Sequence, residues 1–290
     1  MIAKLDTVRS LLTLLFVLPC AAACLGQSTS KFAPPQSHEL LDRALASELR
    51  AARDTSHPMR YRLRKCSPRL TSAKEILETR DGAVARLVSI NDKPLSQADE
   101  QKEAARLDAL LADPGRQRHR KQNEDQDTER ALKVLRALPS AFLYQLVGTG
   151  AGPSGKVEKF AFKPNPGFSP PDLETQVLTA MTGEIWIDTA QERVTRLEGH
   201  LERDVDFGWG ILGRLNKGGW IVIEQADVSK RQWRIVRFQM VMTGRVLFKT
   251  KSFDTVEEQT QYTPLSTGLS YRQAIQMLRA PAEGAARAER

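Results

Sequence analysis

The stretch that decides the fold runs from Gly183 to Tyr262 and contains five apolar segments: GEIWID (183–188), RVTRLEGHL (193–201), GGWIVIEQADV (218–228), WRIVRFQMVMTG (233–244) and RVLFKTKSF (245–253). Each segment is rich in β-branched and aromatic residues, and the breaks between them carry turn-forming residues. The pattern therefore predicts a run of antiparallel strands. It includes no constellation of catalytic residues.

The segments before this stretch predict a helix followed by three more strands. Leu41, Ala44, Leu45, Leu49 and Ala52 form one apolar stripe, which predicts a helix over 38–53 that begins after a Ser37 cap. Alternation predicts a strand over 59–66 (MRYRLRKC), whose outer face carries Arg60, Arg62 and Arg64. Such a row of arginines is typical of a solvated or edge-protecting face, which we favour, or of a phosphate site.

The dipeptide Asp81-Gly82 predicts a two-residue hairpin turn between the next two strands. A loop of that length sets the register, and it predicts the cross-strand pairs Arg80/Ala83, Glu78/Ala85 and Ile76/Leu87.

A charged insertion at about 91–138 interrupts the strand pattern. Ser96 is expected to cap a helix over 97–112, and Pro114-Gly115 to end it. The segment 116–127 (RQRHRKQNEDQD) has no apolar residue and predicts a mobile loop, with a second helix over 128–137. The insertion is a candidate lid or partner surface, or a solvated excursion without a binding role.

The remaining connections are predicted from glycine, proline and polar residues. We expect strands over 141–148 and 157–164, an irregular segment over 164–171, and a short helix or strand over 173–181. Residues 208–219 are expected to form a glycine-rich loop, and 229–232 and 243–244 to form turns. Ser270 and Gln273 have the spacing of a capping box for a last helix over 271–280, with a disordered tail over 281–290.

The amino terminus has the features of a secretory signal peptide over about 1–26. Lys4 and Arg9 precede an apolar run (11–18) that is shorter than a membrane span, and small residues follow. Cleavage near Gly26 is favoured over lipid attachment at Cys24. Residues 27–37 then form a linker to a single β-rich domain over 38–280.

Composition restricts the function classes. The formal net charge is +8, but the positive residues are spread along an exported chain. We therefore expect no nucleic-acid partner, and at most a peripheral attraction to anionic membrane or envelope polymers. With two of the three cysteines in the signal region, Cys66 is left single and is expected to pack at a strand end.

The sequence carries no recognisable catalytic, cofactor or metal motif. Gly208, Gly210 and Gly213 spell G-x-G-x-x-G, but no βαβ alternation surrounds them, so no dinucleotide site is expected. The four histidines are dispersed, and Asp204 with Asp206 gives too few carboxylates for calcium. We expect no enzyme, no cofactor and no metal.

The segments GEIWIDTAQERVTRLEG (183–199) and WRIVRFQMVMTGRVLFKT (233–250) resemble paired strands of the periplasmic outer-membrane lipoprotein-sorting and carrier superfamily. The chain is also similar to exported bacterial proteins with PNPGFSPP (164–171) and FGWGILG (207–213) segments, for which no activity is implied. The superfamily resemblance implies an incomplete β-barrel that holds acyl chains under a helical lid. It also implies the periplasm or outer envelope of a Gram-negative-type bacterium.

The expected fold is α+β, with a curved antiparallel sheet or open β-barrel and helices at its concave face or opening. The expected function is binding of a lipid, acyl chain or lipoprotein segment in an apolar cavity. Candidate cavity residues, whose alternative role is plain core packing, are Trp186, Trp220, Phe238, Met240 and Met242. The alternatives are an envelope protein–protein scaffold acting through residues 97–135 and, more weakly, a hydrolase.

Overall fold

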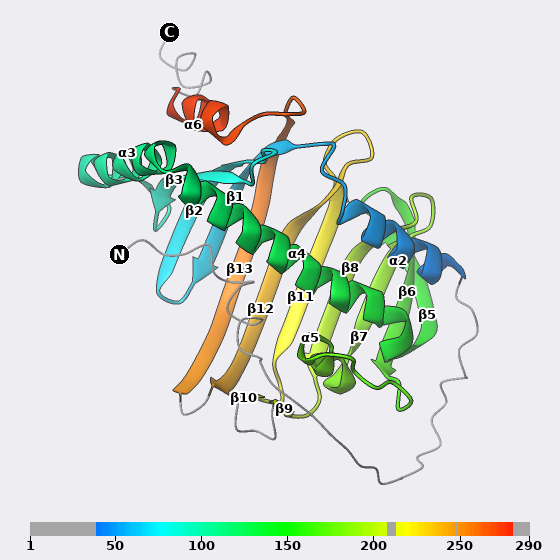
Figure 1. The fold of residues 1–290 in the computed structure, drawn as a ribbon. Coiled ribbons are helices and arrows are strands. Elements are labelled where there is room, and N and C mark those ends of the chain that lie inside the picture. Colours follow the sequence, from blue (N-terminus) through cyan, green and yellow to red (C-terminus); the bar gives the residue numbers. More distant parts are fainter. Residues whose placement is uncertain (1–38, 208–212, 247–248, 281–290) are drawn as a thin grey trace. The chain divides into compact units, whose positions relative to one another are not determined.

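One antiparallel sheet organises the chain (Figure 1). The computed structural model describes residues 39–207, 213–246 and 249–280. In these residues the sheet has 13 strands in the order β4-β3-β2-β1-β13-β12-β11-β8-β7-β6-β5, with β10 joined to β12 and β9 joined to β10. The order has two ends, β4 and β5, so the sheet is open. The predicted α+β class with an open antiparallel sheet is confirmed.

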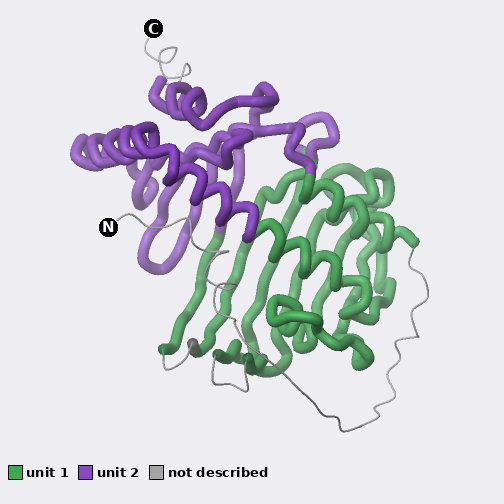
Figure 2. Tube along the Cα trace, viewed as in Figure 1, with its two compact units in different colours: residues 1–53, 127–227, 233–256 green, residues 54–126, 228–232, 257–290 purple. Residues whose placement is uncertain are grey.

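The chain divides into two compact units, which Figure 2 shows in different colours. Unit 1 comprises residues 1–53, 127–227 and 233–256, and unit 2 comprises residues 54–126, 228–232 and 257–290. Along the chain, helix α4 (Pro114–Ala141) and strand β13 (Lys249–Pro264) each pass from one unit into the other. A single domain over 38–280 stays a prediction.

Unit 1 contains most of the strands that decide the fold. Its elements are α2 (Glu39–Ala51), β5 (Phe142–Gly152), β6 (Gly155–Pro164), α5 (Leu173–Gln176), the 3-10 helix η1 (Val177–Ala180), β7 (Met181–Asp188), β8 (Arg193–Leu201), β9 (Val205–Phe207), β10 (Gly213–Leu215), β11 (Trp220–Asp227), β12 (Trp233–Val246) and parts of α4 and β13. The strands predicted over 183–188, 193–201 and 218–228 are confirmed as β7, β8 and β11.

Unit 2 contains the arginine-bearing strand and the capped helices. Its elements are β1 (Met59–Ser67), β2 (Leu70–Leu77), β3 (Val84–Ile90), β4 (Lys93–Pro94), α3 (Gln97–Ala112), α6 (Tyr271–Arg279) and parts of α4 and β13. Two of the three predicted caps are confirmed: Ser96 accepts a hydrogen bond from the Asp99 amide, and Ser270 with Gln273 forms a complete capping box. The third, Ser37, lies outside the described residues. A small core joins Leu77 of β2 to Leu107 of α3 and Ile275 of α6.

The predicted hairpin at Asp81-Gly82 is wrong in register. Ile76 pairs with Ala85, not Leu87, and the last pair joins Leu77 to Val84, so six residues (78–83) lie in the loop. Beyond Leu77 the chain leaves β3 for other partners, because the Glu78 amide donates to the Met59 carbonyl at 3.0 Å.

A local turn with its own side-chain contacts replaces the predicted hairpin. The Thr79 hydroxyl accepts from the Asp81 amide and donates to the Gly82 carbonyl, at 3.1 and 2.7 Å. Only Gly82 has a positive φ, at 93°, whereas a type I′ turn needs two such residues. The Asp81 carboxylate accepts from the Tyr271 amide at 3.1 Å, which binds this turn to the start of α6.

The predicted mobile loop over 116–127 is also wrong, because α4 is a continuous helix of 28 residues. Pro114 occupies its first position, where a missing N–H costs nothing. The Asp113 carboxylate accepts from the amides of Gly115 and Arg116 at 2.9 and 3.3 Å and so caps the helix. Further along, Lys121 pairs with Asp125 at 2.8 Å.

Polar contacts, rather than an apolar stripe, hold the first half of α4 in place. The Gln117 side chain donates from its Nε2 to the Asp81 carbonyl at 2.8 Å, and the Glu124 carboxylate accepts from the Ala83 backbone amide at 3.0 Å. A helix bound in this way shows no hydrophobic periodicity, so its sequence resembles a loop.

Two predicted connections belong partly to strands. Strand β12 continues through Thr243-Gly244 to Val246, where a turn is predicted. Gly244 is needed there because β10 passes close by: a Cβ at this position would lie 2.5 Å from the Arg214 carbonyl oxygen. The predicted loop over 208–219 contains β10, whereas Gly208, Gly210 and the rest of 208–212 lie outside the described residues.

Side chains of α3 satisfy backbone groups of β3 that β2 does not bind. The Glu103 carboxylate accepts from the Leu87 amide at 2.9 Å, and the Arg106 guanidinium donates to the Ala85 carbonyl at 2.5 Å. Glu103 and Arg106 also pair with each other at 2.6 Å. These contacts protect an edge that would otherwise expose unpaired backbone.

Candidate binding site

The apolar face of the unit 1 sheet is the candidate binding site. We call it the inner face and define it by the side chains of Ile185, Ile187, Phe238, Met240 and Met242. Met240 and Met242 are 3% and 2% exposed, and Phe238 is half-buried against the same cluster. Three of the five predicted cavity residues therefore share one face of β12.

The inner face also carries apolar side chains that are only half-buried. Leu197 of β8, Ile221 of β11 and Phe253 of β13 pack against the buried cluster but retain contact with solvent. Ile221 pairs with Met240 in register, and Phe238 pairs with Ile223. The apolar surface thus continues from the fully buried core to side chains that are partly exposed to solvent.

Helices cover this face within unit 1, as Figure 1 shows for α2, α5 and residues 127–141 of α4. The apolar residues that these helices and η1 contribute to the core are Leu41, Ala44 and Leu45 of α2, Ala137, Leu138 and Ala141 of α4, and Leu178 and Ala180 of η1. Lys133 of α4 lies 3.7 Å from Asp172 and 3.5 Å from Glu174, so it links α4 to α5.

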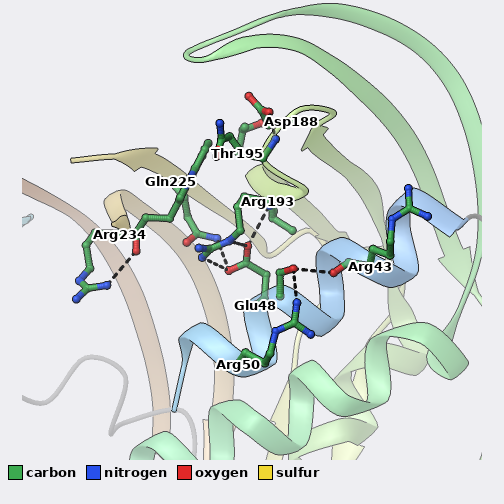
Figure 3. A network of polar contacts seen from close by, with 12 residues as sticks. Arg43, Glu48, Arg50, Asp188, Arg193, Thr195, Gln225 and Arg234 are labelled. Carbon is green, nitrogen blue, oxygen red and sulfur yellow. Dashed lines mark hydrogen bonds and ion pairs between the residues drawn. The ribbon is translucent and has the colours of Figure 1, made fainter. Parts of the chain in front are cut away.

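A buried carboxylate fixes α2 to the sheet (Figure 3). Glu48 is 8% exposed and receives the Arg193 guanidinium at 2.8 and 3.1 Å. The Val194 amide and the Gln225 side chain donate to the same carboxylate at 3.0 and 3.1 Å. Four hydrogen bonds from β8 and β11 therefore converge on one helix residue.

Glu48 takes the position that the sequence pattern assigns to Leu49. The helix buries Leu41, Ala44, Leu45 and Glu48, whereas Leu49 is half-buried. The spacing 41, 44, 45, 48 is itself helical, and Glu48 would complete it if charged residues were counted. Its partner Arg193 is 145 residues away, so no local pattern identifies the pair.

The remaining two cavity candidates lie on the opposite face of the sheet. Trp186 alternates with the buried Ile185 and Ile187, donates to Glu184 at 2.9 Å, and has the Lys159 ammonium 3.8 Å from its ring centroid. Trp220 pairs in register with Val241 and His200. The residues that follow these two in their strands, Met242 and Leu201, belong to the core, so Trp220 points to the other face. A role of either tryptophan in ligand binding stays a prediction.

A serine, a histidine and an aspartate meet in the exposed segment before β1, but their geometry is not that of a catalytic triad. The Ser56 hydroxyl and the Asp54 carboxylate both contact Nδ1 of His57, at 2.8 and 3.1 Å. A triad needs the hydroxyl and the carboxylate on opposite ring nitrogens. The hydroxyl also donates to Asp54 at 2.5 Å, so the three residues form a local turn.

The carboxylates considered for cation binding already have a partner. Arg214 pairs with Asp206 at 2.6 Å and with Asp204 at 3.3 Å. The described ranges contain no group of three or more His, Cys, Asp or Glu side chains arranged to hold a metal. Cys66 forms no disulfide and lies one residue from the end of β1, whereas Cys24 and the signal segment lie outside the described residues.

Within the described ranges, none of the helices combines the length and the apolar character that a membrane span requires.

Comparisons with known proteins return structures only, since no family model and no curated protein sequence matches the chain. The chain is similar to a putative outer membrane lipoprotein-sorting protein domain from Vibrio parahaemolyticus (10% identity, 82% of this chain and 98% of that one, TM-score 0.32). It is also similar to a LolA superfamily protein from Nitrosomonas europaea (10% identity, 82% and 97%, TM-score 0.29) and to MucB in complex with MucA(peri) (13% identity, 78% and 94%, TM-score 0.22).

The first two matches belong to the superfamily that the sequence resembles.

Proposed function

We propose that this protein is an exported, non-enzymatic binding protein that holds a lipid, an acyl chain or a lipoprotein segment against the inner face of unit 1. The observation that carries the proposal is the continuous apolar surface from Met240 and Met242 to the half-buried Phe238, Ile221 and Phe253. Methionine side chains are flexible and polarizable, so they can repack around chains of different shape.

The helical cover supports the same proposal. An apolar ligand gains about 25 cal/mol for each Å² of apolar surface removed from water, but only if the site excludes water. Residues 127–141 of α4 with α5, linked by Lys133, provide such a cover, and α2 is fixed separately through Glu48. Ligand entry would then involve a shift of helices over the sheet.

Two further parts of the proposal rest on the sequence. The signal segment 1–26 supports export to the periplasm or outer envelope of a Gram-negative-type bacterium. Binding of an envelope protein through residues 97–135 stays a prediction. The contacts of Glu103, Arg106, Gln117 and Glu124 with β3 and its turn give these helices a structural task of their own.

A fluorescence titration with dansyl-labelled undecanoic acid tests the proposal. Phe238→Asp places a charge on the half-buried part of the inner face, and we expect at least a tenfold loss of affinity. Val241→Asp is the matched control, since it introduces the same charged side chain on the same strand but on the opposite face. We expect less than a twofold effect there.

Circular dichroism melts of both variants verify that they are folded at the assay temperature. The proposal is refuted if the unmodified protein does not bind the probe. It is equally refuted if the Val241→Asp and Phe238→Asp proteins lose affinity to the same extent.

A further inference from the structure

Unit 2 contains a cavity that the proposed lipid site does not involve. Its volume is about 250 Å³, and its charged lining consists of Arg60 of β1, Glu75 of β2, Arg86 of β3 and Glu100 of α3. Val88, Leu95 and Leu278 provide apolar wall. An arginine-lined cavity with an apolar wall suits a molecule that has an anionic group and an organic part.

The register of the three strands concentrates arginines around one carboxylate. Arg62, Glu75 and Arg86 lie directly opposite one another across β1, β2 and β3. Directly paired residues have their Cβ atoms about 5 Å apart on one face of a sheet. Arg60 forms an ion pair with Glu75 from the neighbouring position on β1, so three arginines share one face of these strands with a single carboxylate.

The three arginines differ in how far their charges are already neutralised. Arg60 shares Glu75, and Arg86 donates to the Leu278 carbonyl at the end of α6, which is a neutral acceptor. Arg62 makes no hydrogen bond or ion pair within the described ranges. By contrast, Arg64 is bound by Asp92 at 2.8 Å and by Glu258 at 3.3 Å, so it is not part of the site.

The balance of charge favours an anion. The cavity lining has two arginines, Arg60 and Arg86, and two carboxylates, Glu75 and Glu100, and Arg62 adds a third positive charge beside Glu75 on the same face. Glu100 is solvent-exposed in the first turn of α3, where water screens its effect. Guanidinium groups present paired N–H donors that match the oxygens of a phosphate.

We propose that the face of β1, β2 and β3 formed by Arg60, Arg62 and Arg86 binds a phosphate group, either free or in the headgroup of an anionic phospholipid. The site is independent of the inner face of unit 1, so the two proposals can fail separately.

Isothermal titration of the full chain with inorganic phosphate, at constant ionic strength, tests the site. Each of Arg62→Gln and Arg86→Gln removes a charge-assisted pair and is expected to weaken binding about tenfold. Arg69→Gln, which changes an exposed arginine in the β1–β2 turn, is the matched control and should alter affinity less than twofold. Glu75→Gln removes the competing carboxylate and should strengthen binding several-fold, a gain that unfolding cannot produce.

Flotation with phosphatidylglycerol vesicles, compared with phosphatidylcholine vesicles, distinguishes the two sources of phosphate. Binding of free phosphate with the expected order of variants supports a soluble ligand. Binding of phosphatidylglycerol vesicles alone, with the same order, supports a headgroup. If neither probe binds, if Arg69→Gln weakens binding as much as Arg62→Gln does, or if Glu75→Gln also weakens it, the proposal is overturned.

Discussion

Replacing Glu48 should destabilise unit 1 more than any change at an exposed charge. Glu48→Leu removes two hydrogen bonds from Arg193 and one each from Val194 and Gln225. The Arg193 guanidinium then remains at the sheet with side-chain exposure of only 13% and no carboxylate. Breaking a buried ion pair in this way costs about 3 kcal/mol.

The partner variant and the double variant separate the ion pair from simple loss of packing. Arg193→Met leaves Glu48 with two neutral donors and should cost about 2 kcal/mol. If the effects were independent, the double variant would lose about 5 kcal/mol. We expect it to lose only about 3, because replacing both charges removes the unpaired one, which gives a coupling of about 2 kcal/mol.

The assay is urea unfolding followed by tryptophan fluorescence. The described tryptophans, Trp186, Trp220 and Trp233, belong to unit 1, so their emission reports that unit and not unit 2. Circular dichroism recorded in parallel shows whether the two units unfold together, which decides whether a two-state analysis applies. A loss below about 0.5 kcal/mol for Glu48→Leu, or additive losses in the double variant, would refute the conclusion that this carboxylate fixes α2.

Three further predictions follow from single contacts. Gly183→Ala places a Cβ 1.8 Å from a backbone carbonyl oxygen of β8 and should lower the free energy of unfolding of unit 1 by about 2 to 3 kcal/mol in the same assay. The control Gly148→Ala places a Cβ with nothing within 4 Å and should change that free energy by less than about 1 kcal/mol. Ser270→Ala removes the capping box of α6 and should cost about 1 kcal/mol, seen as faster amide exchange in that helix; unchanged exchange would contradict it. Hydrogen bonds from Ser56 lower the pKa of Asp54 to about 2. The small stabilisation from the ionised Asp54 is therefore present above its unfolded pKa near 3.9 and is lost as pH falls through about 2. Ser56→Ala should raise the Asp54 pKa in an NMR titration, and an unchanged pKa would show that the Ser56 hydroxyl does not cause the shift.

Much of the fold is predictable because local patterns and tertiary structure agree. Period-2 alternation locates β7, β8 and β11, and the polar residues Ser96 and Ser270 locate the starts of α3 and α6. In each case the residue that determines the local structure lies within a few positions of it. The face of β12 with Phe238, Met240 and Met242 is predictable for the same reason.

The errors arise where distant backbone decides the structure. The first half of α4 is held by the backbone near Asp81. The hairpin register depends on Met59, which lies in another strand. Glycine is required at position 244 because strand β10 passes close to it. None of these contacts leaves a periodic trace. Strand alternation also places Trp186 between Ile185 and Ile187, so it cannot share their face.

Native mass spectrometry of the mature protein, purified from its own envelope and followed by organic extraction, tests the central claim most directly. If the inner face of unit 1 holds an apolar ligand, a lipid or acylated peptide should co-purify, and the Phe238→Asp protein should carry much less of it. A clean unliganded mass that stays unchanged when lipid is offered would contradict the account.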